Sequence, residues 1–336
     1  LRSESIDGGT DLHFLDALGK TVFSWDTKGY QTTISYDALH RPITKHILGN
    51  GLNQLVEHLD YGDLQPNASK YNQKGQVIKH YHQGGIDTNE SFDFKGKPLV
   101  TKQEIRTEYK QEVNWNNPIL EPMLPTTYSS QMRINAVGKV IWNQLPDGSI
   151  QYPDFNKSGQ LKSVKIAYPE TPSKKETIVE NIDYTEKGLR SKITYGNGVT
   201  TSYQYDPLTY ELTGLKSTRK TDGKVLQEIT YFYDAVGNIT RIEDASHQKV
   251  FYNQQQISAT CDFTYNALYQ LKQATGREHP ALSKQAYKTA FKQSGFISLN
   301  DQKALRNYTE TYSYEAAGNL TKLQHKASQN NWTREL

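Results

Sequence analysis

Hydrophobic and polar residues follow one recurring pattern along the chain. An aromatic or aliphatic residue is followed by Asp or Asn, two variable residues, Gly, a polar residue, and then a β-branched residue or Leu. Clear copies are Tyr233–Thr240 and Tyr314–Thr321. Between copies, residues alternate with a period of two, as in 201–205, which is typical of β-strands. The pattern therefore predicts short strands separated by turns.

The copies are spaced regularly. The Asp or Asn position recurs after 21 residues from Asp16 to Asp37 and again from Asn135 to Asn156. A turn glycine such as Gly29 lies eight residues before the next Asp or Asn. Each period thus holds two strands and two turns. Because a lone hairpin cannot bury its own face, the hairpins are expected to pair edge to edge into a long sheet.

Turn chemistry explains the residue types of the pattern. Asp or Asn accepts a hydrogen bond from the backbone N–H two residues on, and the glycine three residues later supplies the positive φ of a bulged hairpin turn. The tyrosine before the turn recurs at one phase of the repeat, as packing along a sheet requires. The expected structural positions are the turn residues Asp37, Asp93, Asp234, Gly237 and Gly318 and the packing residues Tyr36, Tyr205, Tyr233 and Tyr314.

Departures from the period predict insertions. Proline cannot serve a central strand, so the proline-containing segments 62–70, 116–127 and 169–175 are expected to be loops. The longest gap predicts a further insertion at 276–307, in which 281–293 is expected to form a short helix. The predicted fold is all-β, a long antiparallel sheet of repeated β-hairpins. Residues 1–336 are expected to form a single array that is a fragment of a larger protein.

The repeats resemble the RHS, or YD, repeat family. Gly29–Thr44 and Tyr233–Thr240 fit the family pattern closely. The runs Tyr205–Thr213 and 225–239, followed by 265–279, are similar to the RHS portion of the B components of insecticidal toxin complexes (Tc toxins) and of SpvB-like toxins. In this family the repeats spiral into a hollow shell that holds a cytotoxic polypeptide before delivery. The resemblance implies that this chain forms an open part of such a wall.

The resemblance also implies a function and partners. The chain is expected to be a non-enzymatic shell segment of a large bacterial toxin, secreted or at the cell surface. Its implied partners are other RHS-shell parts of the same or a partner component and an encapsulated C-terminal toxin polypeptide. The self-cleaving aspartates of the family are not carried over, because Asp206-Pro207 lies in a repeat context.

A carbohydrate- or receptor-binding cell-surface adhesin built of YD repeats is the alternative. Exposed Tyr, Trp and Asn on turns can bind sugars by stacking and hydrogen bonding. The shell is preferred because the aromatic residue recurs at one phase of every repeat, whereas a binding patch would gather its aromatic residues in one place.

Composition narrows the classes of function. The chain has 336 residues with 23 Tyr and 10 Phe, too many aromatic residues for a disordered chain. A mean hydropathy of -0.77 together with abundant Tyr favours a sheet with a wetted face. A net charge of +3 offers no electrostatic reason to bind nucleic acid. No apolar run approaches the roughly 18 residues of a membrane span.

Candidate chemistry is sparse. His80 and His82 share one strand face as a possible metal pair, but no phased third ligand accompanies them, so solvated histidines are the preferred interpretation. Cys261, the single cysteine, has no histidine in register and is interpreted as a structural thiol. Turns account for the recurring acidic residues, which leaves a glycosidase carboxylate pair as the less favoured interpretation. No catalytic residue, metal or cofactor is expected, and the chain is predicted not to be an enzyme.

Overall fold

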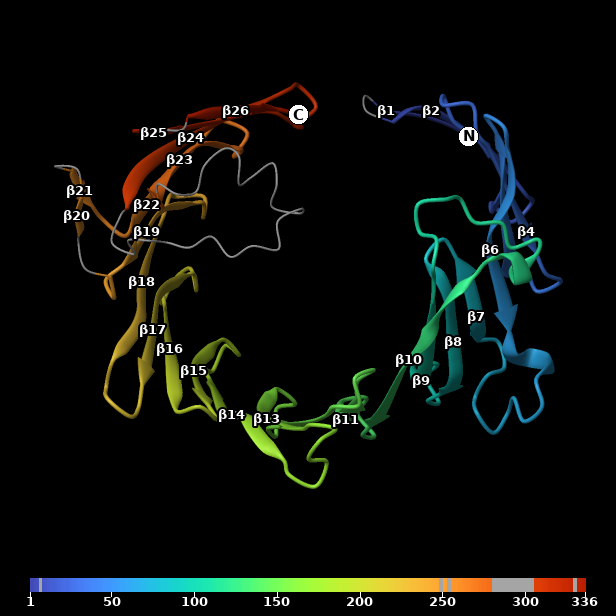
Figure 1. The fold of residues 1–336 in the computed structure, drawn as a ribbon, viewed down its shortest axis with the longest axis horizontal. Coiled ribbons are helices and arrows are strands. Elements are labelled where there is room, and N and C mark those ends of the chain that lie inside the picture. Colours follow the sequence, from blue (N-terminus) through green and yellow to red (C-terminus); the bar gives the residue numbers. More distant parts are fainter. Residues whose placement is uncertain (6–7, 248–249, 253–254, 280–304, 329–330) are drawn as a thin grey trace. The chain divides into compact units, whose positions relative to one another are not determined.

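The chain forms two compact units, Leu1–Glu176 and Thr177–Leu336. A computed structural model describes residues 1–5, 8–247, 250–252, 255–279, 305–328 and 331–336. In each unit, antiparallel strands follow one another in chain order and pair with their neighbours (Figure 1). The predicted all-β fold of repeated hairpins is confirmed.

Unit 1 carries one continuous antiparallel ladder from β1 to β13. Two short 3-10 helices lie in its longer connections, η1 (Gly62–Leu64) and η2 (Pro118–Leu120). The strands are β1 (Arg2–Ser5), β2 (Gly9–Leu15), β3 (Thr21–Trp25), β4 (Gln31–Tyr36), β5 (Pro42–Gly49), β6 (Leu52–Tyr61), β7 (Val77–His82), β8 (Gly85–Phe92), β9 (Pro98–Arg106), β10 (Met123–Ile134), β11 (Val140–Gln144), β12 (Ile150–Phe155) and β13 (Leu161–Ala167).

Unit 2 continues the same plan. Its ladder passes from β19 directly to β22, while β20 and β21 pair with each other as a separate hairpin. The strands are β14 (Glu176–Tyr184), β15 (Arg190–Tyr195), β16 (Val199–Tyr205), β17 (Leu212–Arg219), β18 (Val225–Tyr233), β19 (Ile239–Asp244), β20 (Val250–Tyr252), β21 (Gln255–Ile257), β22 (Thr260–Tyr265), β23 (Leu271–Glu278), β24 (Arg306–Tyr314), β25 (Leu320–Ala327) and β26 (Trp332–Glu335).

The insertions lie between strands, with bounds that differ from the predicted ones. The connection after β6 extends to residue 76, where 62–70 was expected. The connection after β9 covers 107–122, because β10 begins at Met123, inside the predicted loop 116–127. The predicted loop 169–175 lies between β13 and β14. At 276–307, strand β23 continues to Glu278, and the helix predicted at 281–293 lies outside the described residues.

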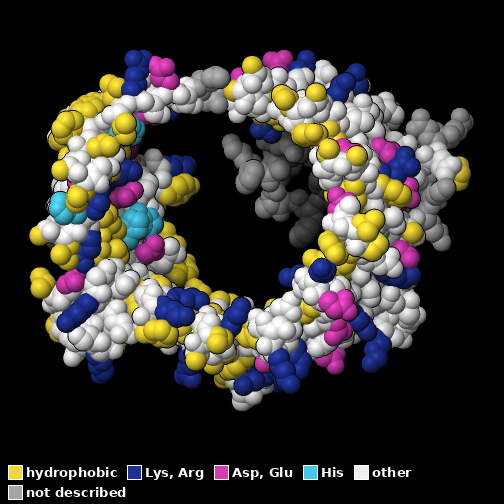
Figure 2. Space-filling model, turned by 180° about the vertical axis from the view of Figure 1, so that it is seen from behind, with side chains coloured by type: hydrophobic (Ala, Val, Ile, Leu, Met, Phe, Trp, Pro, Cys, Tyr) yellow, Lys and Arg dark blue, Asp and Glu magenta, His cyan; other side chains and the backbone are white. Residues whose placement is uncertain are grey.

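Buried apolar side chains are few and dispersed. In the view of Figure 2, hydrophobic side chains reach the surface and are mixed with charged ones. Most strand positions are only partly buried, so both faces of the sheets are partly solvated, as the polar composition indicates. Among the described residues, the buried hydrophobic side chains are Ala68, Ile78, Phe92, Val113, Trp115, Ala167, Ile182, Ile193, Ile257 and Ala274.

Candidate functional site: the tyrosine rim

Hairpin turns lie along two rims of each sheet, because consecutive strands run in opposite directions. We call one of them the tyrosine rim; it carries the turns after β2, β4, β6, β8, β10 and β12 in unit 1 and after β14, β16, β18, β22 and β24 in unit 2. The turns between the remaining successive strands form the opposite rim. The recurring sequence pattern lies mainly on the tyrosine rim.

Each tyrosine-rim turn is closed by hydrogen bonds between nearby residues. The Asp37 carboxylate oxygen Oδ1 accepts the backbone N–H groups of Leu39, at 2.9 Å, and Arg41, at 2.8 Å. The His40 N–H donates to the Asp37 carbonyl at 2.9 Å. The strand register shifts by one residue at Tyr36, which is the bulge of the turn. One carboxylate oxygen thus satisfies two backbone donors that the turn leaves unpaired.

The same geometry recurs at the other predicted turn residues. Asp93 accepts the N–H groups two and four residues on, each at 2.8 Å, and Asp234 does so at 3.0 and 2.9 Å. Gly237 and Gly318 have φ values of 88° and 94°. Where other residues replace this glycine, as His40 and Tyr269 do, φ is 57° and 62°, so the turn keeps its left-handed residue.

The tyrosine before the turn has a second role that the sequence does not reveal. Its hydroxyl donates to a backbone carbonyl in the preceding turn of the same rim, at the first residue of the strand that leaves that turn. Each bond therefore joins two neighbouring hairpins, in addition to the strand ladder. The bonds are Tyr36 to Thr21 (2.8 Å), Tyr61 to Pro42 (3.0 Å), Tyr205 to Arg190 (2.9 Å), Tyr233 to Leu212 (2.7 Å), Tyr265 to Ile239 (2.8 Å) and Tyr314 to Leu271 (2.9 Å).

Electrostatics keep both partners in the state that these bonds need. The backbone N–H of Arg41, helped by its guanidinium group, lowers the pKa of Asp37. The side-chain amide of Asn238 and nearby backbone N–H groups lower the pKa of Asp234. Burial raises the pKa of Tyr233, which keeps its hydroxyl protonated and able to donate.

One copy of the sequence pattern has a different geometry. Tyr71–Val77 reads as a full repeat, yet the Asn72 side chain donates to the Phe92 carbonyl at 3.0 Å. The turn is closed instead by Gly62, whose N–H donates to the Gln76 carbonyl, and Tyr61 supplies the rim hydroxyl. The insertion therefore sits inside a rim turn and separates its two halves.

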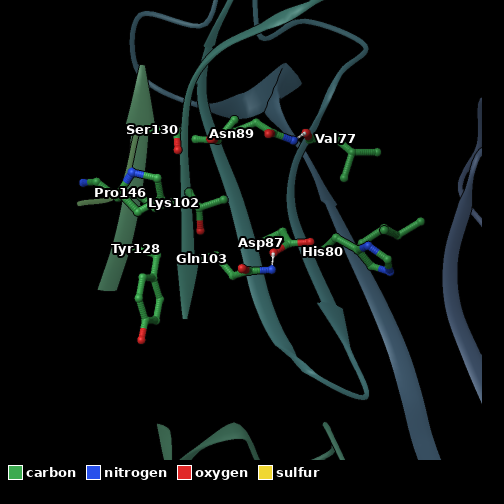
Figure 3. A pocket seen from close by; sticks show the side chains of 12 residues that line it. Val77, His80, Asp87, Asn89, Lys102, Gln103, Tyr128, Ser130 and Pro146 are labelled. Carbon is green, nitrogen blue, oxygen red and sulfur yellow. Dashed lines mark hydrogen bonds between the residues drawn. The ribbon is translucent and has the colours of Figure 1, made fainter. Parts of the chain in front are cut away.

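A polar pocket of about 550 Å³ lies on one face of unit 1, over β6 to β10 (Figure 3). Strand register places His80, Asp87, Gln103 and Tyr128 in one row across four strands. The Gln103 amide donates to Asp87 Oδ1 at 3.0 Å. The row presents hydrogen-bonding groups and a tyrosine ring to the pocket, a combination suited to a polar ligand.

The histidine pair of β7 adjoins this pocket. The rings of His80 and His82 are 5.0 Å apart, and the structure adds Asp87, whose Oδ2 lies 3.2 Å from His82 Nε2. The Gly84 N–H donates to His82 Nδ1 at 3.1 Å, which ties the ring to the β7–β8 turn. Across the residues that the structure describes, no group of three or more His, Cys, Asp or Glu could hold a metal.

Unit 2 contains a buried ionic cluster that the sequence analysis missed. His325 lies between two carboxylates, with Nδ1 3.2 Å from Glu310 Oε1 and Nε2 3.2 Å from Glu278 Oε1. Arg306 Nε donates to Glu278 Oε1 at 2.8 Å, and Arg306 Nη2 lies 2.6 Å from the same oxygen. The carboxylates face partners inside the sheet, so the cluster joins β23, β24 and β25. Its members come from three strands, and no local motif could have revealed it.

Cys261 lies on β22 and is half-buried. Burial raises the pKa of its thiol, which lowers the fraction of reactive thiolate at neutral pH. This environment favours the interpretation as a structural thiol over a nucleophile.

None of the helices in the described part of the chain has the length and apolarity needed to cross a membrane.

Comparisons with known proteins place the chain beside toxin subunits. It is 26% identical to toxin subunit YenC1 of Yersinia entomophaga over its whole length and 27% identical to toxin subunit YenC2 over 99% of its length. It spans only 35% and 37% of these two relatives. No family model matches the sequence.

The fold comparison agrees. The chain superposes over its entire length on the crystal structure of TcdB2-TccC3, with a TM-score of 0.85, 28% sequence identity and 16% of that chain covered. A Photorhabdus luminescens Tc holotoxin pore matches equally, with a TM-score of 0.85 and 28% identity over the same share of each chain. The resemblance to the RHS repeats of insecticidal toxin complexes is therefore confirmed: the chain is homologous to the YenC toxin subunits and has the fold of the matched part of TcdB2-TccC3.

Proposed function

We propose that this chain is a non-enzymatic wall segment of a large secreted bacterial toxin of the RHS-repeat type. The observation that carries the proposal is the match to TcdB2-TccC3 over 100% of the chain at 28% identity. The tyrosine rim supports it, because hydroxyl bonds from turn to turn stiffen a long sheet without requiring a central core. The whole array, 1–336, acts as one segment of that wall.

The partners of this segment follow from the same proposal. Other RHS-shell parts, in the same or a partner component, continue the wall, and a cytotoxic C-terminal polypeptide is the cargo. The proposed residue roles are Asp37, Asp93, Asp234, Gly237 and Gly318 in the turns. Tyr36, Tyr205, Tyr233 and Tyr314 join neighbouring hairpins.

Protease protection tests this function. The complete toxin component that contains this chain is assembled with its partner component, and the cargo is probed with a protease before and after the shell is unfolded. We expect the cargo to survive inside the intact shell and to be digested once the shell is denatured. Digestion at the rate of the free cargo in the intact assembly would refute the proposal.

Carbohydrate binding is the second candidate, and the polar pocket of Figure 3 is the observation that favours it. Tyr128 and Ser130 on β10 offer an aromatic ring and a hydroxyl beside Asp87 and Gln103. A glycan array with the chain, and with Tyr128→Ala as the matched variant, separates the two candidates. Saturable binding that the variant loses would favour the adhesin; the shell proposal expects no such binding.

A further inference from the structure

Large apolar side chains stand exposed at the tips of the tyrosine-rim turns. They occupy the position two residues after the residue that opens the turn, or one residue after it in the case of Phe94. Their exposed fractions run from 59% for Val236 to 96% for Leu64. The residues at these tips are Leu18, Leu39, Leu64, Phe94, Val137, Leu208, Val236 and Leu268.

Turn formation does not require these side chains. Ser158 and Lys187 occupy the same position in two other turns of the rim. The tips of the opposite rim are largely polar. Among the described turns, the exceptions are the β9–β10 connection, with exposed Tyr109, Ile119 and Leu120, and Tyr168 at the start of the β13–β14 connection. The polar tips are Lys28, Asn50, Gln83, Asp147, Asn197 and Asp222. The apolar tips therefore distinguish one rim from the other.

In unit 1 the apolar tips form an unbroken row. Leu18, Leu39, Leu64, Phe94 and Val137 occupy five successive turns of the rim. Neighbouring turns are two strands apart, which gives a spacing of about 9.5 Å. Each side chain would remove on the order of 100 Å² of apolar surface from water if it were covered, so the row offers about 500 Å². Apolar surface of several hundred Å² is often functional in proteins.

We propose that this row is a self-complementary docking surface, against which the same row of a second copy of the chain packs. A second copy of the chain has the same spacing of about 9.5 Å and the same apolar tips, so it can place its tips between those of the first rim. Two copies would bury about 1,000 Å² in total, the lower limit of a specific interface. The association is therefore expected to be weak and two-fold symmetric. The proposal does not depend on what the wall encloses.

Sedimentation velocity tests the proposal on the whole chain, from about 1 to about 100 µM, a range suited to an interface of minimal size. We expect a concentration-dependent dimer, and an at least tenfold weaker one in the triple variant Leu18→Asn, Leu39→Asn and Leu64→Asn. The matched control changes Lys28→Asn, Gln83→Asn and Asp222→Asn on the opposite rim and should dimerise as the wild type does. Circular dichroism checks that both variants fold.

Two results would overturn the proposal: a wild-type chain that stays monomeric throughout, or dimers that the triple variant retains, since the sheet edges would then be the contact. A cross-link gives a second measurement that does not depend on stability. In a Cys261→Ser background, Leu64→Cys should be joined between copies by a bismaleimide. Lys28→Cys should not be joined, and equal cross-linking at both positions would place the contact away from the row.

Discussion

At the scale of the residue, the repeat is a set of donors and acceptors that satisfy one another. The Asp or Asn oxygen takes the two backbone N–H groups that the tight turn leaves unpaired, and the tyrosine hydroxyl reaches a carbonyl of the neighbouring turn. An unpaired backbone group at a half-buried turn is unfavourable, which gives each of these side chains a definite energetic role. The sequence pattern therefore encodes two things: a hairpin turn, and a hydrogen bond from that turn to the neighbouring turn of the same rim.

Removal of one rim hydroxyl measures that connection. Tyr233→Phe deletes the 2.7 Å bond to the Leu212 carbonyl but keeps the ring. We expect the free energy of unfolding to fall by about 0.5–1.5 kcal/mol, the usual net value of such a bond, as measured by urea denaturation. Tyr109→Phe, at a largely exposed tyrosine outside the rim, is the control and should change little. Equal effects at both positions would contradict the role assigned to the rim hydroxyl.

Because of the turn carboxylates, the free energy of unfolding should fall at acid pH. Backbone N–H groups of Thr209 and Leu208 lower the pKa of Asp206 from its ordinary value of 3.8. A lowered folded-state pKa means that the ionised group stabilises the fold above about pH 4, and that this contribution is lost as the pH falls through the folded-state pKa.

Asp206→Asn removes this titration while keeping the acceptor oxygen, as Asn266 does in its own turn. We expect the midpoint of acid unfolding, followed by circular dichroism, to move to lower pH. Asp154→Asn, at an exposed strand position, serves as the control. A midpoint that stays where it is in the Asp206 variant would show that this carboxylate does not titrate differently in the folded and unfolded chain.

At the scale of the element, long strands create edges that the insertions cover. Strand β6 runs from Leu52, but β7 pairs with it only from His58 onward. The β9–β10 connection occupies the open stretch: the Trp115 N–H donates to the Leu55 carbonyl at 2.8 Å. An uncovered strand edge invites pairing with other chains, so this connection protects β6.

Trp115 anchors the β9–β10 connection, so its removal should strongly destabilise the fold. It is buried at 3% exposure, and its ring lies 5.2 Å from that of Tyr81. Trp115→Ala should lower the free energy of unfolding by about 3–5 kcal/mol, because it leaves a cavity of aromatic size. Ile119→Ala, in the same connection but 92% exposed, should change it by less than about 0.5 kcal/mol in the same urea titration. Comparable losses for both would show that the connection is not anchored on β6.

Whether a strand tolerates proline also depends on the strands that pair with it. The rule that proline cannot serve a central strand holds at the insertions, yet Pro153 lies inside β12, opposite Val164 of β13. The pairs between β11 and β12 end at Gln151, so β11 offers no acceptor that the missing N–H would leave unpaired. Only the register of both neighbouring strands shows why this proline is tolerated.

At the scale of the whole molecule, stability is distributed along the array. Strands in each ladder pair with their neighbours, and the rim hydroxyls span one repeat. A sheet built in this way approaches a one-dimensional chain of units, in which a local defect stays local.

A damaged turn tests this locality. Gly237 has φ of 88°, which a β-branched side chain resists, so Gly237→Val should destabilise its hairpin by at least about 1–2 kcal/mol. Hydrogen exchange measured by mass spectrometry should show faster exchange in β18 and β19 and unchanged exchange in β2 to β6. Gly237→Asn, a residue that tolerates positive φ, should have a milder effect. Uniform loss of protection across the chain would indicate a single cooperative unit instead.

The sequence by itself determined the strands, the turns and their phase, because these depend on contacts within a few residues: a carboxylate with the N–H groups two and four residues on, and a residue at positive φ. It also led to the RHS resemblance, since that family is defined by the same local pattern. The same pattern also occurs at Tyr71–Val77, but there the Gly62 N–H closes the turn and the Asn72 side chain bonds elsewhere, so the local pattern alone predicts the wrong turn.

Only the tertiary structure decided which residues meet across strands. The Tyr233 hydroxyl finds Leu212, and His325 lies between Glu278 and Glu310, because strand register brings distant positions together. The same register puts most of the apolar turn tips on one rim and most of the polar tips on the other. The alternation of side chains along a strand shows which face of the sheet each residue lies on. Which residues pair across strands, and which rim a turn lies on, depend on the order and register of whole strands.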